Sequence, residues 1–169
     1  MNLHEHLLTC LAEECGEVME ILYLDSSNED ELEHELNDII SVAHLLNDNE
    51  IISVDLRPTN TQTSEREKTD VQYRNIFSLV SKIHYLTCKS LRFGLNNIKP
   101  NSIRLNKAEL ELFLESLVTA LGNNNSDIKL WDRRELKVKE EKVVANYKLA
   151  IENNTLKFKD KSMIIGDKI

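Results

Sequence analysis

Apolar side chains recur every three or four residues over two stretches at the start of the chain. Residues 3–24 and 29–46 each carry such a stripe, which at about 100° per residue covers one face of an amphipathic helix. Residues 25–28 interrupt the pattern with Asp, Ser and Asn, which are typical of helix N-caps. Because this connection is short, we expect two antiparallel neighbouring helices. The stripes are Leu7, Leu8, Leu11, Cys15, Val18, Met19 and Leu22, and then Leu32, Leu36, Ile39, Ile40 and Ala43.

Three more helices are predicted after a polar interruption. The apolar period disappears between residues 48 and 70, where Thr, Asn, Gln and Ser dominate. Gly94 and Gly122 each follow a periodic stretch, and glycine is the usual residue just beyond a helix C-terminus. The last residues, from Thr155 onward, fit either a short strand or a loose tail. The predicted helices span residues 71–93, 106–121 and 132–153.

These elements predict a single all-α domain with a four-helix-bundle-like core, made of two helical hairpins, plus a C-terminal helix. The length of 169 residues suits one domain. Four glycines, two prolines and 5% aromatic residues disfavour a β-sandwich or barrel. Within residues 1–169 the expected parts are a first hairpin (1–50), a polar loop (51–70), a second hairpin (71–124) and a C-terminal helix with a tail (125–169).

Charge and cysteine content narrow the function classes. The net charge is −8, from 21 Lys and Arg against 29 Asp and Glu, which argues against nucleic acid or an anionic membrane as a partner. Neither a signal peptide nor a membrane-spanning run is predicted, so a cytoplasmic location is expected. The three cysteines include no CxxC pair and are odd in number, which disfavours a disulfide framework or a zinc ribbon.

Two pairs of carboxylates lie at the inward edges of the first two helices. Residues three apart share a helix face, so Glu14 projects with Glu17, and Glu35 with Asp38. Carboxylates that face one another across packed helices repel at low dielectric, so a positive charge is required among them. Four oxygen donors without His or Cys suit a hard divalent cation, Mg²⁺ or Mn²⁺. A solvated acidic face is the alternative interpretation.

The same residues carry a resemblance. Glu13-Glu14-x-x-Glu17, followed after 17 residues by Glu35-x-x-Asp38, resembles the EExxE…ExxD signature of the all-α nucleoside triphosphate pyrophosphohydrolases. These are MazG-like proteins of phage and bacterial type, related to the dimeric dUTPases and dCTP pyrophosphatases. The signature falls within residues 3–48, under a third of the chain. The resemblance implies a helical fold and Mg²⁺-dependent cleavage of a (d)NTP to a (d)NMP and pyrophosphate.

The resemblance also implies roles for individual residues. Glu14, Glu17, Glu35 and Asp38 would hold the metal, which would make residues 1–50 the catalytic hairpin. Glu13 would be an accessory catalytic carboxylate that holds the attacking water. The partners implied are a nucleoside triphosphate substrate and a second copy of the chain, as a homodimer or higher homo-oligomer.

Four further side chains are candidates for contacts with the substrate phosphates. Lys89 and Arg92 have an alternative role as cations at a helix C-terminus, where they would interact with the helix dipole. Lys142 and Asn146 resemble a Lys/Asn-bearing C-terminal segment of the family, although exposed solubilising residues would look the same. Trp131 fits either a stacking residue for a base or an interface anchor.

The second half of the chain departs from the family pattern. Residues 89–95 resemble a segment that follows the EExxE helix directly in MazG-like sequences, but here they follow the third predicted helix. A duplicated unit whose second copy has lost its metal site explains this order, and so does an insertion into a single unit. Aligning the two halves on this segment places Ser78, Leu79 and Lys82 at the EExxE positions, and Phe113 and Ser116 at the ExxD positions.

Two other functions compete with the pyrophosphohydrolase. A non-catalytic nucleotide-binding or helical interaction module would tolerate the altered second half. A di-iron carboxylate bundle requires two Glu-x-x-His motifs on facing helices, and only Glu31-x-x-His34 fits.

Overall fold

The structure is a computed structural model of the chain, and it describes residues 2–24, 28–58, 68–96, 105–123 and 126–153. The described part is all-helical, which confirms the predicted fold class, and the helix ends lie within about two residues of their predicted positions. The predicted tail from residue 154 onward lies outside the described residues. The helices are α1 (Leu3–Leu24), α2 (Glu29–Asp48), α3 (Thr69–Phe93), α4 (Asn106–Leu121) and α5 (Arg133–Glu152).

Side-chain caps fix where three of the helices begin. The Asn2 side chain accepts a hydrogen bond from the Glu5 amide at 2.8 Å, at the start of α1. Asn28 does the same for the Glu31 amide at 3.2 Å, as the polar break before α2 predicted. Asp132 caps α5 through the Glu135 amide at 2.9 Å. At the other end of α3, Gly94 has a φ of 93°, a left-handed conformation that favours glycine.

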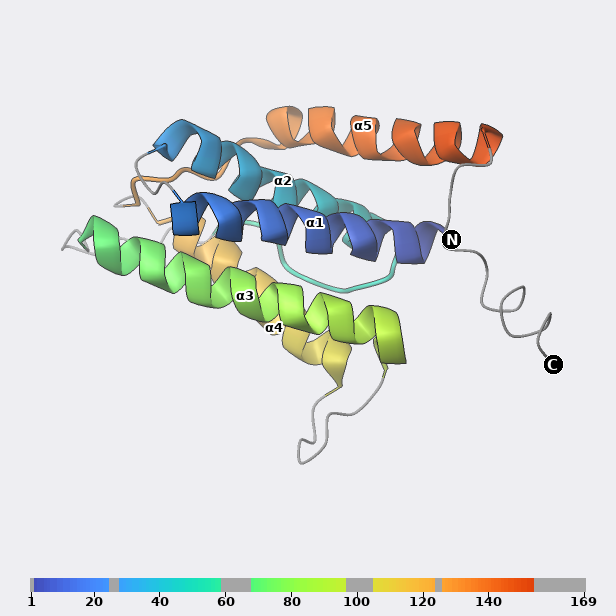
Figure 1. The fold of residues 1–169 in the computed structure, drawn as a ribbon, viewed down its shortest axis with the longest axis horizontal. Helices are drawn as coiled ribbons and strands as arrows, with labels where there is room; N and C mark the ends of the chain where they lie inside the picture. The colour runs from blue at the N-terminus through green and yellow to red at the C-terminus, as the bar shows by residue number, and fades with distance from the viewer. Residues whose placement is uncertain (1, 25–27, 59–67, 97–104, 124–125, 154–169) are drawn as a thin grey trace.

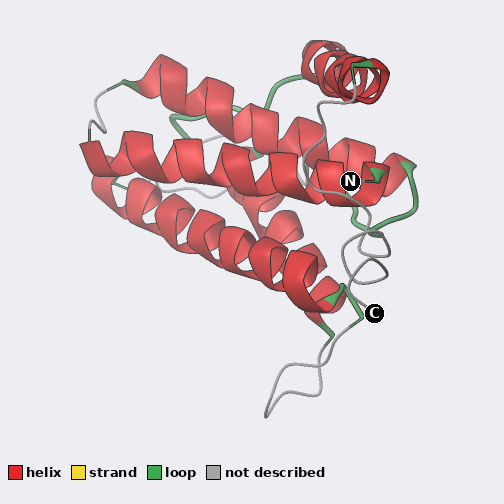
Figure 2. Cartoon of the chain, turned by 45° about the vertical axis from the view of Figure 1, so that its right-hand side comes forward, coloured by secondary structure: helices red, strands yellow, loops and turns green. Residues whose placement is uncertain are grey.

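Helix α1 lies at the centre of the molecule. It packs against α2 on one side and against α3 on the other, while α4 packs mainly on α3 (Figure 1). The pairs α1–α2 and α3–α4 are the two predicted hairpins. Helix α5 lies along the outer side of α2, and Figure 2 shows it almost end-on. Fully buried core side chains come from both hairpins and include Leu7, Leu11, Cys15, Leu36, Ile39, Ile40, Val80, Ile83, Leu110, Leu114 and Leu117.

The stretch after α2 corrects one expectation. Residues 51–58 are not part of a polar loop, because Ile52, Val54 and Leu56 are buried and belong to the core. They alternate with exposed residues in an extended segment. Two α4 carboxylates hold this segment: Glu111 accepts from the Ser53 amide at 2.6 Å, and Glu115 accepts from the Asp55 amide at 3.3 Å. Residues 59–67 of the predicted loop lie outside the described part.

Two further observations bear on the sequence predictions. Cys10, Cys15 and Cys88 are free cysteines, and Cys15 is buried. Among the described helices, none has both the length and the apolar character needed to cross a membrane.

Candidate metal centre

The antiparallel pairing of α1 and α2 brings three of the four predicted metal ligands together. Glu14, Glu17 and Glu35 each offer a carboxylate oxygen within 4.8 Å of the other two. Asp38 lies one turn beyond Glu35 on the same helix. Glu14 and Asp38 are only 7% and 4% exposed, whereas Glu17 lies at the exposed rim. We call these four residues the acidic cluster.

The acidic cluster is under electrostatic strain. Burial raises the pKa of Glu35 to about 8, helped by its contact with Glu17 and by the charges of Glu17, Asp38 and Glu14. Burial also raises the pKa of Glu14. One oxygen on each of these two side chains, Oε2 of Glu14 and Oε2 of Glu35, is buried without a hydrogen-bond partner. A buried carboxylate oxygen without a partner is costly, so the cluster favours either a proton or a cation at this place.

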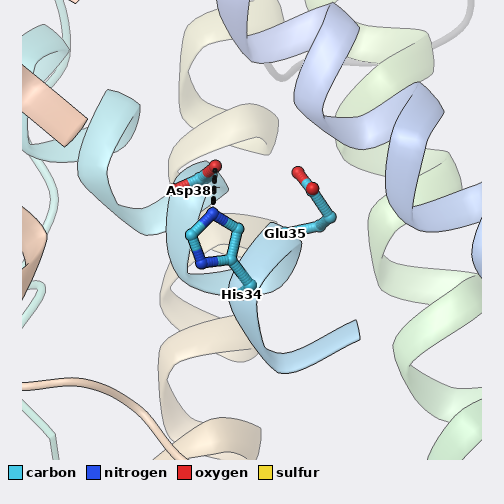
Figure 3. A group of neighbouring side chains, drawn as sticks. All are labelled: His34, Glu35 and Asp38. Carbon is cyan, nitrogen blue, oxygen red and sulfur yellow. Dashed lines mark ion pairs between the residues drawn. The ribbon is translucent and has the colours of Figure 1, made fainter. Parts of the chain in front are cut away.

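A histidine joins the edge of the acidic cluster. His34, Glu35 and Asp38 form a second group of potential donors within 4.8 Å of one another, and Nε2 of His34 lies 3.6 Å from Oδ2 of Asp38 (Figure 3). In Figure 3 Glu35 lies on the side of α2 that faces α1. His34 was considered from the sequence only with Glu31, but its i, i+4 spacing to Asp38 was the signal for this contact.

The positive charge within reach of the acidic cluster comes from α5. Nζ of Lys139 lies 2.7 Å from Oε1 of Glu14 and 3.2 Å from Oδ2 of Asp38. Burial alone would lower the pKa of Lys139, but the hydrogen bonds and charges of Glu14 and Asp38 outweigh it and raise that pKa. Sequence reasoning did not identify Lys139. Its signal was its place on α5, three residues after Leu136 and four before Val143, both of which are buried.

The segment before α5 is anchored on α2, the helix that carries Glu35 and Asp38. Asn37 lies between the motif residues and is fully buried; it donates to the Lys129 carbonyl and accepts from the Trp131 amide, both at 2.8 Å. Glu33 accepts from the Lys129 amide at 2.7 Å and from Nε1 of Trp131 at 3.3 Å. The Trp131 ring also meets the His34 ring edge-on at 5.2 Å. Trp131 therefore packs within the molecule, where it anchors the segment before α5 on α2.

The remaining predicted residues lie apart from these contacts. Glu13 is exposed on α1, next to Glu14 in the chain. Lys89 and Arg92 lie at the end of α3, which packs against α1 and α4 and, among the described helices, not against α2 or α5. Nζ of Lys89 lies 5.5 Å from the ring centre of Tyr85, and the Arg92 guanidinium lies 4.8 Å from that of Phe93. The contacts that the structure gives Lys89 and Arg92 are therefore within α3, and none of them is with the acidic cluster.

Two predicted residues do lie on the helix that reaches the acidic cluster. Lys142 and Asn146 are exposed on α5, one and two turns after Lys139. They face solvent, so the structure places them near the centre without a contact to it.

A hollow opens beside the acidic cluster, between the end of α1 and the start of α2. Its volume is about 460 Å³, and Glu17 and Glu35 belong both to the cluster and to this hollow. The lining residues are Glu17, Glu20, Ile21, Leu24, Glu31 and Glu35. Such a wall admits an anion only together with cations.

The second hairpin carries other residues at the positions that correspond to the metal motif of the first hairpin. Lys82 corresponds to Glu17 and Phe113 to Glu35, and Nζ of Lys82 lies 5.2 Å from the centre of the Phe113 ring. Lys82 and Phe113 therefore meet across α3 and α4, as Glu17 and Glu35 do across α1 and α2.

No family model, curated protein or solved structure matches the chain.

Proposed function

We propose that the chain is a Mg²⁺-dependent nucleoside triphosphate pyrophosphohydrolase that cleaves a (d)NTP to a (d)NMP and pyrophosphate. The observation that carries the proposal is the convergence of Glu14, Glu17 and Glu35 within 4.8 Å, beside Asp38. These are the residues that the EExxE…ExxD resemblance assigns to the metal. They come from two helices, and their proximity depends on the fold as well as on the motif.

The acidic cluster fits a hard divalent cation. Its donors are carboxylate oxygens, which Mg²⁺ and Mn²⁺ prefer, and two of these oxygens are buried without a hydrogen-bond partner. Glu14, Glu17, Glu35 and Asp38 would hold the ion. A bound cation would neutralise charge on the phosphates, polarise the phosphoryl oxygen and lower the pKa of the attacking water.

The protein's own residues would position the cation, control the entry of substrate and accept a proton. Glu14 and Asp38 are buried and packed, so they fix the position of the cation, while Glu17 and Glu35 present it to the hollow. The hollow is acidic, so a triphosphate enters it only together with the cation, and this requirement makes binding metal-dependent. Glu13, exposed beside Glu14, is the proposed acceptor of a proton from the attacking water.

Two parts of the proposal concern binding partners. Lys142 and Asn146 on α5 are the proposed phosphate contacts, because their helix already reaches the acidic cluster through Lys139. A homodimer follows from the resemblance, and Tyr23 and Leu24 at the end of α1 are 83% and 69% exposed beside the hollow. A second copy would cover this apolar surface.

A pyrophosphate-release assay tests the proposed function. The full chain is incubated with Mg²⁺ and each common NTP and dNTP in turn, with EDTA and the Asp38→Asn variant as controls. We expect Mg²⁺-dependent release of pyrophosphate and a nucleoside monophosphate from at least one substrate, and none in either control. Absence of release from every substrate would contradict the proposal.

A non-catalytic nucleotide-binding module is the second candidate, and one observation favours it. Lys139 already pairs with Glu14 and Asp38, so a cation is not needed to neutralise those two carboxylates. Binding of a nucleotide without release of pyrophosphate would identify this module. Among the residues that the structure describes, a di-iron centre gains one nitrogen donor near the acidic cluster, His34, and iron analysis of the purified protein would test it.

A further inference from the structure

Lys139 contacts the two most buried carboxylates of the acidic cluster at once. Its Nζ lies 2.7 Å from Glu14 and 3.2 Å from Asp38, and the side chains of these acids are 9% and 6% exposed. A fixed ammonium group and a divalent cation cannot both lie against these oxygens, because like charges at this separation repel strongly. We propose that Lys139 is the resident counter-ion of the metal-free site and that a divalent cation binds by displacing it.

The packing of α5 explains why Lys139 is held there. Asn37 and Glu33 fix the backbone of residues 129 and 131 on α2, directly before the helix begins. Leu136 and Val143 are then buried on the inner face of α5, one on each side of Lys139 in the chain. The ammonium group is thus positioned by the docking of the whole helix.

The same geometry allows the ammonium group to leave. The side chain of Lys139 is 26% exposed, and its stem has four flexible methylenes, so Nζ can turn to water while α5 stays in place. The exchange replaces one positive charge with two, so the divalent cation neutralises more of the charge of the four carboxylates than the ammonium group does. It also means that the site holds its shape without metal and binds the ion more weakly than the same four carboxylates would without Lys139. This inference rests on the proposed function because it requires that the acidic cluster bind a divalent cation.

The test measures binding of Mn²⁺ to the full-length chain by electron paramagnetic resonance, for the wild type, Lys139→Gln and Lys137→Gln. Lys137 is the matched control, because it lies two residues before Lys139 on the same helix, is exposed, carries the same charge and has no proposed role at the site. We expect Lys139→Gln to bind Mn²⁺ about tenfold more tightly than Lys137→Gln. Equal affinities in the two variants would overturn the displacement proposal alone. Absence of Mn²⁺ binding in all three proteins would overturn the metal site, and the displacement with it.

A second measurement uses the wild type and does not depend on whether a variant folds. Acetic anhydride labels exposed lysine amines, and mass spectrometry locates each label. Saturating Mg²⁺ should increase labelling of Lys139 several-fold relative to the exposed Lys137, because displacement moves the Lys139 amine into water. Unchanged relative labelling at a Mg²⁺ concentration that fills the site would overturn the proposal.

Discussion

The two hairpins share a helix arrangement but differ in the charges between their helices. In α1–α2, matched positions hold Glu17 and Glu35, whose carboxylates repel and shift the pKa of Glu35 upward. In α3–α4, the same positions hold Lys82 and Phe113, which attract each other. Only the first hairpin, among the described helices, packs against α5.

This difference shows what each hairpin contributes. The second hairpin places Lys82 over the Phe113 ring, and its apolar core supports α1. It also has a buried oxygen without a hydrogen-bond partner, Oδ1 of Asn106, but that atom belongs to an uncharged amide. The first hairpin leaves buried oxygens without partners and depends on Lys139 from α5 to balance the charges of Glu14 and Asp38. Unfavourable electrostatics of this kind is typical of sites that bind ligands, because binding relieves it.

The largest expected effect comes from neutralising one carboxylate in the first hairpin. Glu17→Gln or Asp38→Asn should lower pyrophosphate release by about a hundredfold or more, since each removes a proposed metal ligand. The helical circular dichroism signal should not change. Lys82→Gln, at the position that matches Glu17, should keep activity within about twofold. A fully active Asp38→Asn variant would remove the proposed ligand set.

A change in the core of the second hairpin should affect stability rather than activity. Leu114→Ala should lower the free energy of unfolding by about 2–5 kcal/mol, because the Leu114 side chain is fully buried on α4. Chemical denaturation measures this loss. The activity per folded molecule should stay close to that of the wild type, and a large loss of it would mean that α4 contributes to the chemistry.

The pH dependence of stability sharpens the contrast. The folded protein keeps a proton on Glu35 up to about pH 8, while the unfolded chain releases it near 4.5. The unfolded state therefore binds fewer protons in this window, and stability falls as the pH rises through it. Melting temperatures in EDTA should decrease from pH 4.5 to about 8, and Glu35→Gln should flatten that slope. An unchanged slope in the variant would show that Glu35 is not the group responsible.

The smallest expected effect concerns Gly16, a glycine inside α1. A methyl group added here meets no other side chain within 4 Å, so no close helix contact accounts for the glycine. Gly16→Ala should raise the free energy of unfolding by about 1 kcal/mol through helix propensity. We also expect a higher KM for the triphosphate, because the methyl group narrows the space beside Glu17. An unchanged KM would show that this space is not used by substrate.

Much of the fold could be predicted from local pattern. The stripe from Leu7 to Val18 and the stop at Gly94 are properties of single helices, and both are confirmed. The buried segment from Ile52 to Leu56 was missed, although its residues alternate in the sequence. Three alternating apolar residues are too few to stand out beside long helical stripes, and it is the neighbouring α4 that holds the segment.

The candidate site could be predicted only where one local motif specifies it. Glu14, Glu17 and Glu35 meet because a short connection forces α1 and α2 together. Lys139 reaches the same place through the docking of α5 on Asn37, more than ninety positions away in sequence from the segment it holds. A contact between residues so far apart leaves no periodic pattern in the sequence. Lys89 was a candidate phosphate contact, with a helix-end cation as the alternative, and the structure places its Nζ against Tyr85 of the same helix.

The most direct test is an anomalous diffraction map of crystals grown with Mn²⁺. Our account predicts an anomalous peak bounded by carboxylate oxygens of Glu14, Glu17, Glu35 and Asp38, with Nζ of Lys139 turned away from Glu14. A map without a peak there, with Lys139 still paired to Glu14 and Asp38, would contradict it.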